Sequence, residues 1–199
     1  MTAYSKYEAD TIVGIDEILN HNESEEKNYK KKDIIIRLDP DNAQCGIIRK
    51  GMACLMSISD DGEKSILDYF NSGDLFGAPF IPLSGTNLYY IMASAPCTAV
   101  LFSYKDFSCS PAVSKLTESL IRRVHMHTDI LCQRTIRRKL MLYINYMARG
   151  YNKNSFSLPL SLSDLADYLA VDRSAMMREL KKLNNEHIIY SKGQNITIL

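Results

Sequence analysis

The stretch SLSDLADYLAVDRSAMMREL, residues 161–180, constrains the fold most, because two short helical patterns lie in it with a break of only three residues. Ser161 and Asp164 form an S-x-x-D pattern, in which the serine oxygen accepts hydrogen bonds from free amides at a helix start. Asp172 is a typical cap for a second helix, which the pattern places at 173–185. Two short helices joined this tightly are typical of a helix-turn-helix.

The second of these helices has two chemically different faces. Met176, Leu180 and Leu183 would be buried, whereas the other face carries Arg173, Ser174, Met177, Arg178, Lys181 and Lys182. Arginines at the start of such a helix suit bidentate contacts with guanine in the major groove, and lysines further along suit phosphates. We therefore predict that these six residues bind DNA. A charged face that is only solvated is the alternative.

The flanking sequence supports the same interpretation. Residues 187–199, HIIYSKGQNITIL, predict two short strands about Lys192-Gly193, which would form a β-hairpin wing. From residue 134 onward, eleven basic residues face five acidic ones, giving a net charge of +6, whereas the first 133 residues carry −5. A basic end on an acidic body predicts a polyanion as the partner of that end, with a chance surface distribution as the alternative.

The first half of the chain has a different texture. Residues 1–32 are polar with helical-looking pieces, and from 33 to 104 short apolar runs alternate with turn signals. The runs are IIIR (34–37), MACLMSI (52–58), LYYIM (88–92) and TAVLFSY (98–104). Strands this short, separated by Gly, Asp and Asn turns, predict an antiparallel barrel or roll.

Two longer helices are predicted next. Residues 112–133 contain neither glycine nor proline, and their apolar stripe consists of Val113, Leu116, Leu120, Val124, His127 and Leu131. The stripe fits either a helix packed on its own domain or the seam of a coiled-coil dimer. A second amphipathic helix, 135–149, would end at Gly150, a residue type favoured just beyond a helix end. A short polar linker, YNKNSFS (151–157), would join it to the helix-turn-helix.

The chain resembles the catabolite-activator and fumarate-nitrate (Crp/Fnr) family of bacterial transcription regulators over residues 25–199. KGMACLMSISDDGEKSILDYFNSGDLFG resembles the family's β-roll hairpin and glycine-rich loop, SYKDF resembles the end of the roll, and LSLSDLADYLAVDRSAMMREL resembles the DNA-reading unit. The resemblance implies that the long helix is the dimer helix. It also implies that Arg173, Ser174 and Arg178 occupy base-contacting positions.

The fold that the resemblance implies is of the α+β class and has three parts. An antiparallel β-roll, a jelly roll of the cyclic-nucleotide-binding type, would sense an effector over residues 1–110. A dimerisation helix would follow at 111–134, and a winged helix-turn-helix would bind DNA at 135–199.

The sensor loop departs from the cyclic-nucleotide branches of the family, which use Gly-Glu in the loop and a nearby Arg-Ser. Here the loop reads Gly77-Ala78 and the aligned pair reads Asn87-Leu88. The residues from 65 to 104 include no lysine or arginine, so a buried cyclic phosphate would lack a cation unless Arg122 or Arg123 reached it.

We therefore predict an effector that is not a cyclic nucleotide. The candidate pocket residues are Phe76, Gly77, Ala78, Asn87, Leu88, Tyr90 and His127. The alternative is that these residues belong only to the core of the roll and the pocket is vestigial.

The predicted function is a homodimeric, sequence-specific transcription regulator, whose partners are double-stranded DNA and, for an activator, RNA polymerase. A binding module that acts through protein contacts is the alternative. No enzyme motif, CxxC pair or early cysteine for an iron–sulfur cluster occurs, and His125 and His127 point to different helix faces. We expect no enzyme activity, no metal and no cofactor. Without an apolar span or signal sequence, we expect a cytoplasmic protein.

Overall fold

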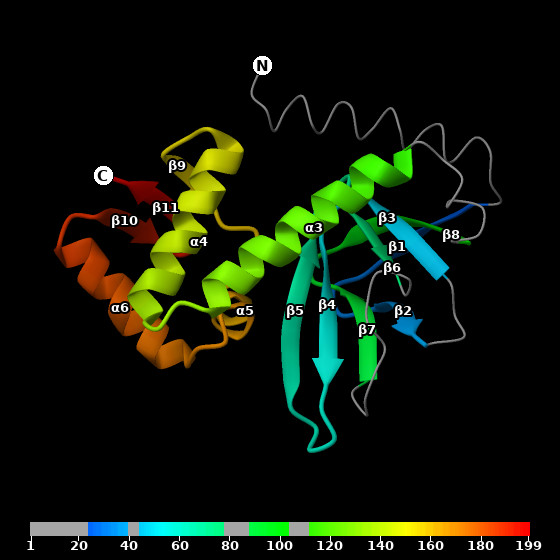
Figure 1. The fold of residues 1–199 in the computed structure, drawn as a ribbon, viewed down its shortest axis with the longest axis horizontal. Coiled ribbons are helices and arrows are strands. Elements are labelled where there is room, and N and C mark those ends of the chain that lie inside the picture. The colour runs from blue at the N-terminus through cyan, green and yellow to red at the C-terminus, as the bar shows by residue number, and fades with distance from the viewer. Residues whose placement is uncertain (1–23, 40–43, 78–87, 104–111) are drawn as a thin grey trace. The chain divides into compact units, whose positions relative to one another are not determined.

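The computed structural model describes residues 24–39, 44–77, 88–103 and 112–199. These residues form two compact units, which divide between Val124 and His125 inside the helix α3 (Ala112–Leu131). The predicted boundaries at 111 and 134 lie on either side of this division. Figure 1 shows the strands of the first unit and the helices of the second.

The first unit contains two four-stranded antiparallel sheets. One has the order β1 (Glu25–Tyr29), β8 (Cys97–Ser103), β3 (Gln44–Lys50) and β6 (Leu75–Gly77). The other has the order β2 (Ile34–Leu38), β7 (Leu88–Ala93), β4 (Ala53–Ile58) and β5 (Lys64–Phe70). Both sheets contribute to one buried cluster, which includes Ile48 and Leu101 from the first and Leu55 and Ile91 from the second. The predicted antiparallel roll is confirmed.

Strand β1 corrects the expectation of a helical-looking piece in this part of the chain. Its residues pair with β8 in antiparallel register from Glu25 opposite Leu101 to Tyr29 opposite Cys97. The first four side chains of β1 are exposed. The strand is therefore held by backbone pairing with β8, which a polar sequence without alternation does not predict.

The second unit begins with the C-terminal part of α3 and continues through α4 (Ile136–Tyr151), α5 (Leu162–Tyr168) and α6 (Arg173–Asn185). A three-stranded sheet has the order β10 (Ile189–Lys192), β11 (Asn195–Ile198) and β9 (Ser155–Ser157). The core of this unit combines buried residues of α4, α5 and α6: Leu140, Tyr143, Ile144, Met147, Leu165, Ala166, Met176, Leu180 and Leu183. The winged helix-turn-helix is confirmed.

Two local expectations for this unit were wrong. Helix α4 does not end at Gly150 but continues to Tyr151, and Asn152 takes the left-handed conformation (φ 50°) that ends it. Asparagine tolerates this conformation better than most residues, so glycine is not required there. The segment expected as a polar linker contains β9, which pairs with β11 and places Phe156 opposite Ile196.

Candidate nucleic-acid interface

The first helix of the motif is capped as its sequence predicts. The Ser161 hydroxyl oxygen accepts a hydrogen bond from the Asp164 amide at 3.2 Å. Leu165 and Ala166 are fully buried, and the Val171 amide donates to the Ala166 carbonyl at 3.0 Å across the turn. The small side chain of Ala166 thus lies in the core of this unit, and its carbonyl helps to fix the turn between the two helices.

Asp172 caps the second helix, α6, and engages Ser174 in doing so. One carboxylate oxygen, Oδ1, accepts hydrogen bonds from the Ala175 amide at 2.8 Å and from the Ser174 hydroxyl at 2.6 Å. The hydrogen bonds from Ser174 and Ala175 lower the pKa of Asp172. The cap therefore stays ionised at neutral pH, and the negative charge lies at the helix N-terminus, where it is favourable.

The predicted DNA-binding residues share one exposed side of α6. Arg173, Ser174, Met177, Arg178, Lys181 and Lys182 are all exposed, whereas Met176, Leu180 and Leu183 are buried. Both faces of the helix were thus placed correctly from the sequence. Met177 is an apolar side chain within the cationic face, with 39% of its surface exposed.

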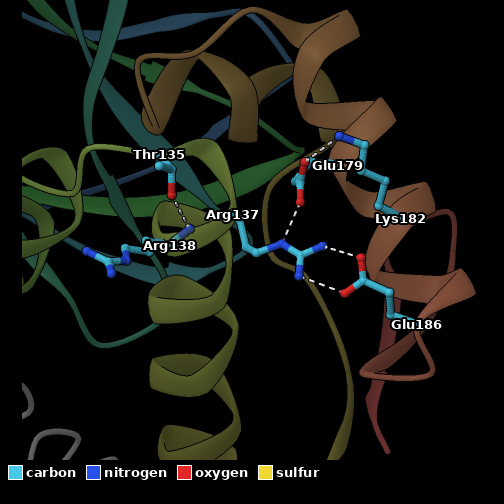
Figure 2. Close-up of polar contacts among 6 residues, drawn as sticks. All are labelled: Thr135, Arg137, Arg138, Glu179, Lys182 and Glu186. Atoms are coloured by element: carbon cyan, nitrogen blue, oxygen red, sulfur yellow. Dashed lines mark hydrogen bonds and ion pairs between the residues drawn. The ribbon is translucent and has the colours of Figure 1, made fainter.

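Helix α6 is tied to α4 by an ion-pair cluster centred on Arg137 (Figure 2). Arg137 Nε donates to Glu179 at 2.6 Å, and its two terminal nitrogens donate to the two oxygens of Glu186, each at 2.7 Å. Lys182 Nζ lies 3.5 Å from the other oxygen of Glu179. These hydrogen bonds from Arg137 lower the pKa values of Glu186 and Glu179, so both carboxylates are charged at neutral pH.

Further contacts fix the end of α5 and the wing. Lys139 Nζ donates to the Leu169 carbonyl at 2.9 Å. Asn184 and Ser191 exchange two hydrogen bonds of 2.7 Å, which join the end of α6 to β10. The Gln194 amide donates to two carbonyls of the segment before α5, those of Leu158 and Leu160. Helix α6 and the wing, which is the β10–β11 hairpin, are therefore held by polar contacts as well as by the apolar core.

His127, predicted both for the dimer seam and for the effector pocket, contacts α5. Its ring stacks on Tyr168 with centroids 3.9 Å apart and planes 8° from parallel. One ring nitrogen lies 2.7 Å from the Tyr168 carbonyl oxygen. Its observed partner is thus the first helix of the helix-turn-helix.

The candidate pocket residues are placed only in part by the structure. Ala78 and Asn87 lie outside the described residues, and Leu88 is exposed. Phe76 and Tyr90 are buried, and the Phe76 ring packs with Phe70 at a centroid distance of 5.7 Å.

Gly46 allows this packing of Phe76, and Gly77 allows β6 to lie close to β3. A Cβ at Gly46 would lie 2.4 Å from the Phe76 ring. Gly77 has φ +149°, and a Cβ there would lie 2.7 Å from Cys45 Cα. The observed role of Phe76 is in the core of the roll, and the pocket remains a prediction.

Arg123 forms a buried ion-pair cluster with two aspartates of the roll, which sequence reasoning missed. Its Nη1 donates to Asp74 at 2.7 Å, and its Nε donates to Asp68 at 3.3 Å. The guanidinium also lies 5.2 Å from the centre of the Phe70 ring. Arg122, the other cation considered for a cyclic phosphate, is exposed and pairs with Glu118.

The predicted seam of α3 is only partly exposed. Val124 and Leu131 have 50% and 40% of their surfaces exposed, and Leu120 is half-buried. The side chains of Val113 and Leu116 lie outside the described residues. Ile121, which was not predicted, is 50% exposed. Its spacing of three residues from Val124 could have revealed it.

The described part of the chain shows neither a metal centre nor a membrane helix. In that part, no group of three or more His, Cys, Asp or Glu side chains could hold a metal ion. None of its helices is long and apolar enough to cross a membrane.

Two family models match separate parts of the chain. A model described as "Cyclic nucleotide-binding domain" matches residues 26–108, and one described as "Crp-like helix-turn-helix domain" matches residues 134–199. The first covers most of the roll, and the second covers α4 to the C-terminal strand. The division between them agrees with the change from strands to helices.

Curated relatives and solved structures match over most of the chain. The chain is 23% identical over 188 residues to "Transcriptional activator protein FnrA" of Stutzerimonas stutzeri, covering 85% of this chain and 75% of that protein. It is 20% identical over 183 residues to "cAMP-activated global transcriptional regulator CRP" of Pasteurella multocida, covering 85% and 88%.

Two solved structures support the fold. FixK2 from Bradyrhizobium japonicum matches with a TM-score of 0.69 and 21% identity, covering 88% of this chain and 92% of that one. A mutant of CooA from Carboxydothermus hydrogenoformans matches with a TM-score of 0.73 and 17% identity, covering 92% and 89%. At these identities the structural matches show a shared fold.

Proposed function

The chain belongs to the Crp/Fnr family of transcription regulators and has its DNA-binding helix-turn-helix, and on this premise we propose a homodimeric, sequence-specific regulator whose roll binds a small effector other than a cyclic nucleotide. The observation that carries the proposal is the exposed cationic face of α6, on a helix fixed by its cap and by Arg137. For an activator, RNA polymerase would be a further partner.

Sequence reading is assigned to the N-terminal part of α6. Arg173 and Arg178 are exposed there, and arginine makes the commonest specific contact with guanine, through the O6 and N7 atoms. Lys181 and Lys182 lie further along the same helix and are assigned to phosphates, which lie outside the groove. Since Lys182 lies within 3.5 Å of Glu179, its phosphate contact would compete with that carboxylate.

Dimerisation is assigned to a narrower apolar stripe on the exposed side of α3, which includes Ile121 in addition to two residues of the predicted seam. Ile121, Val124 and Leu131 follow each other at steps of three and seven residues, which is the spacing of one coiled-coil face. Each has at least 40% of its surface exposed. A second copy of the same helix would bury this stripe, as the sequence resemblance implies.

The contacts of Arg122 and Arg123 support an effector that is not a cyclic nucleotide. Both arginines already pair with carboxylates of the chain, and Arg123 is 9% exposed. A cyclic phosphate would have to displace Asp68 and Asp74 from a buried guanidinium, which would leave those charges without their cation. An uncharged or aromatic effector avoids this cost.

DNA binding by the full-length protein tests the proposal. A duplex operator selected from a random library is compared with a random duplex of equal length, over a series of salt concentrations. Loss of Arg178 in Arg178→Ala should cost about 1–3 kcal/mol per half-site on the operator and lower the ratio of specific to non-specific affinity.

Lys182→Ala is the matched variant on the same helix. It should weaken both duplexes alike and flatten the salt dependence, because phosphate contacts release counterions regardless of sequence. Equal loss on both duplexes for Arg178→Ala would contradict its assignment to a base. Absence of any sequence preference in the wild-type protein would instead favour a module that acts through protein contacts.

A further inference from the structure

We propose that Met177 reads the C5 methyl group of a thymine in each half-site, and that the Ser174 hydroxyl serves the α6 cap instead of a base. This inference rests on the proposed function and adds the chemistry of one base. It starts from the one large apolar side chain found in the exposed cationic face of α6.

The exposed cationic face of α6 includes Met177, close to its edge at Arg173. At about 100° per residue, Met177 lies about 40° around the helix from both Arg173 and Lys181. Arg178 follows at about 100°. A helix that enters the major groove with Arg173 and Arg178 facing the bases would also bring Met177 within reach of a base edge, between Arg173 and Lys181.

Packing within the chain leaves part of Met177 uncovered. The core contact at this turn of α6 is made by its neighbour Met176, which is fully buried, whereas 39% of Met177 is exposed. Within the major groove, the thymine methyl is the apolar group that side chains contact to distinguish thymine from cytosine. Methionine suits this contact because its flexible thioether adapts to an apolar group that is slightly displaced.

Ser174 has a different hydrogen-bonding role, although it lies on the same face. Its hydroxyl proton is donated to Asp172 Oδ1 at 2.6 Å, on the same oxygen that accepts from the Ala175 amide at 2.8 Å. Donation to a base would remove this hydrogen bond from the cap of the reading helix. The hydroxyl has one proton only, so Ser174 cannot donate to both.

Deoxyuridine substitution tests the methyl contact directly. An operator is first selected from randomised duplexes by the full-length wild-type protein. Each thymine of a half-site is then replaced in turn by deoxyuridine, which keeps the Watson–Crick edge and removes only the C5 methyl. Affinities are measured at one fixed salt concentration for the wild type, Met177→Ala and the matched variant Met177→Leu, with helicity checked by circular dichroism.

We expect one thymine position at which deoxyuridine weakens wild-type binding about fourfold per half-site, the effect of exposing one buried methyl group. At that position deoxyuridine should not weaken binding by Met177→Ala, whereas it should still weaken binding by Met177→Leu by most of this factor. The methyl contact is refuted if deoxyuridine has the same effect on the wild type and on Met177→Ala at every thymine. It is also refuted if deoxyuridine weakens Met177→Ala and Met177→Leu by the same factor.

A separate variant tests the assignment of Ser174 to the cap. Ser174→Ala should keep the base preference of the wild type at every operator position and lower only the thermal stability of the DNA-binding unit. A changed preference at any position would overturn the assignment to the cap. Specific binding that persists while either arm fails refutes this inference alone, whereas loss of all sequence preference in the wild type refutes the proposed function.

Discussion

Replacing Arg123 by methionine removes the charge at the centre of the buried cluster and keeps a long, unbranched side chain. In the wild type the Arg123 side chain is 11% exposed, and the Asp68 and Asp74 side chains are 11% and 19% exposed. Each aspartate also accepts a backbone amide, from Tyr69 and Asn71 respectively. These contacts would hold both carboxylates in place after the guanidinium is gone.

The expected cost follows from that burial. Removing one partner of a buried ion pair costs about 3–5 kcal/mol, because a charge remains buried without compensation. Only one of the two Arg123 contacts is short, 2.7 Å to Asp74 against 3.3 Å to Asp68. We therefore take the lower end, about 3 kcal/mol at pH 7, which corresponds to roughly a 150-fold increase in local opening.

The deficit should shrink as the pH falls. Burial raises the pKa of Asp74 even in the wild type, where Arg123 opposes that shift. Without Arg123 the pKa of Asp74 should rise further, so the folded state takes up a proton before the unfolded state does. The penalty is then fully present above the raised pKa and decreases as the pH falls through it toward the ordinary value near 4.

Native-state hydrogen exchange read by mass spectrometry on peptides of β4 and β5 measures this opening in the roll itself. The control is Arg122→Met, one residue earlier, whose exposed pair with Glu118 should contribute little. A triple variant, Arg123→Met with Asp68→Asn and Asp74→Asn, should regain part of the loss because no charge stays buried. A pH-independent deficit, or one below about 1 kcal/mol, would refute the reasoning.

Three further predictions concern the dimer, the effector and the thiols. Ile121→Glu with Val124→Glu should give monomers in sedimentation at low micromolar concentration; a double variant that stays dimeric would place the interface elsewhere. Calorimetry should find no micromolar binding of cyclic AMP or cyclic GMP to the wild type, and such binding would disprove the assignment of the effector. Iodoacetamide at pH 8 should modify exposed Cys132 in the native protein and leave Cys45 unmodified, because burial raises the pKa of the Cys45 thiol to about 12. Equal labelling of both would contradict this.

The helix-turn-helix could be predicted residue by residue because its signals are local. The caps Ser161 and Asp172 and the two faces of α6 all follow from spacings of a few residues. Such patterns determine hydrogen bonding and burial within one or two turns. These patterns can therefore be recognised without knowledge of the rest of the fold.

The ion-pair cluster centred on Arg137, which ties α6 to α4, could not be predicted in this way. Arg137 is separated from Glu179 by 42 residues and from Glu186 by 49. Nothing near any of the three distinguishes it from a solvated surface charge. Only the packing of α4 against α6 brings both carboxylates within 2.7 Å of the Arg137 guanidinium.

Strand β5 shows why the buried cluster in the roll was also hidden. Residue type alone would place the apolar Leu67 inside and its charged neighbour Asp68 outside, but Leu67 is 36% exposed and Asp68 is buried. The pairing of β4 with β5 shifts there, with Leu55 opposite Asp68 and Met56 opposite Ile66, so Leu67 is an extra residue at a β-bulge. Asp68 is buried opposite Leu55, and this burial is tolerable because Arg123 supplies the opposite charge. A rule based on residue type cannot anticipate this arrangement, since the buried aspartate and the cation that compensates its charge lie 55 residues apart.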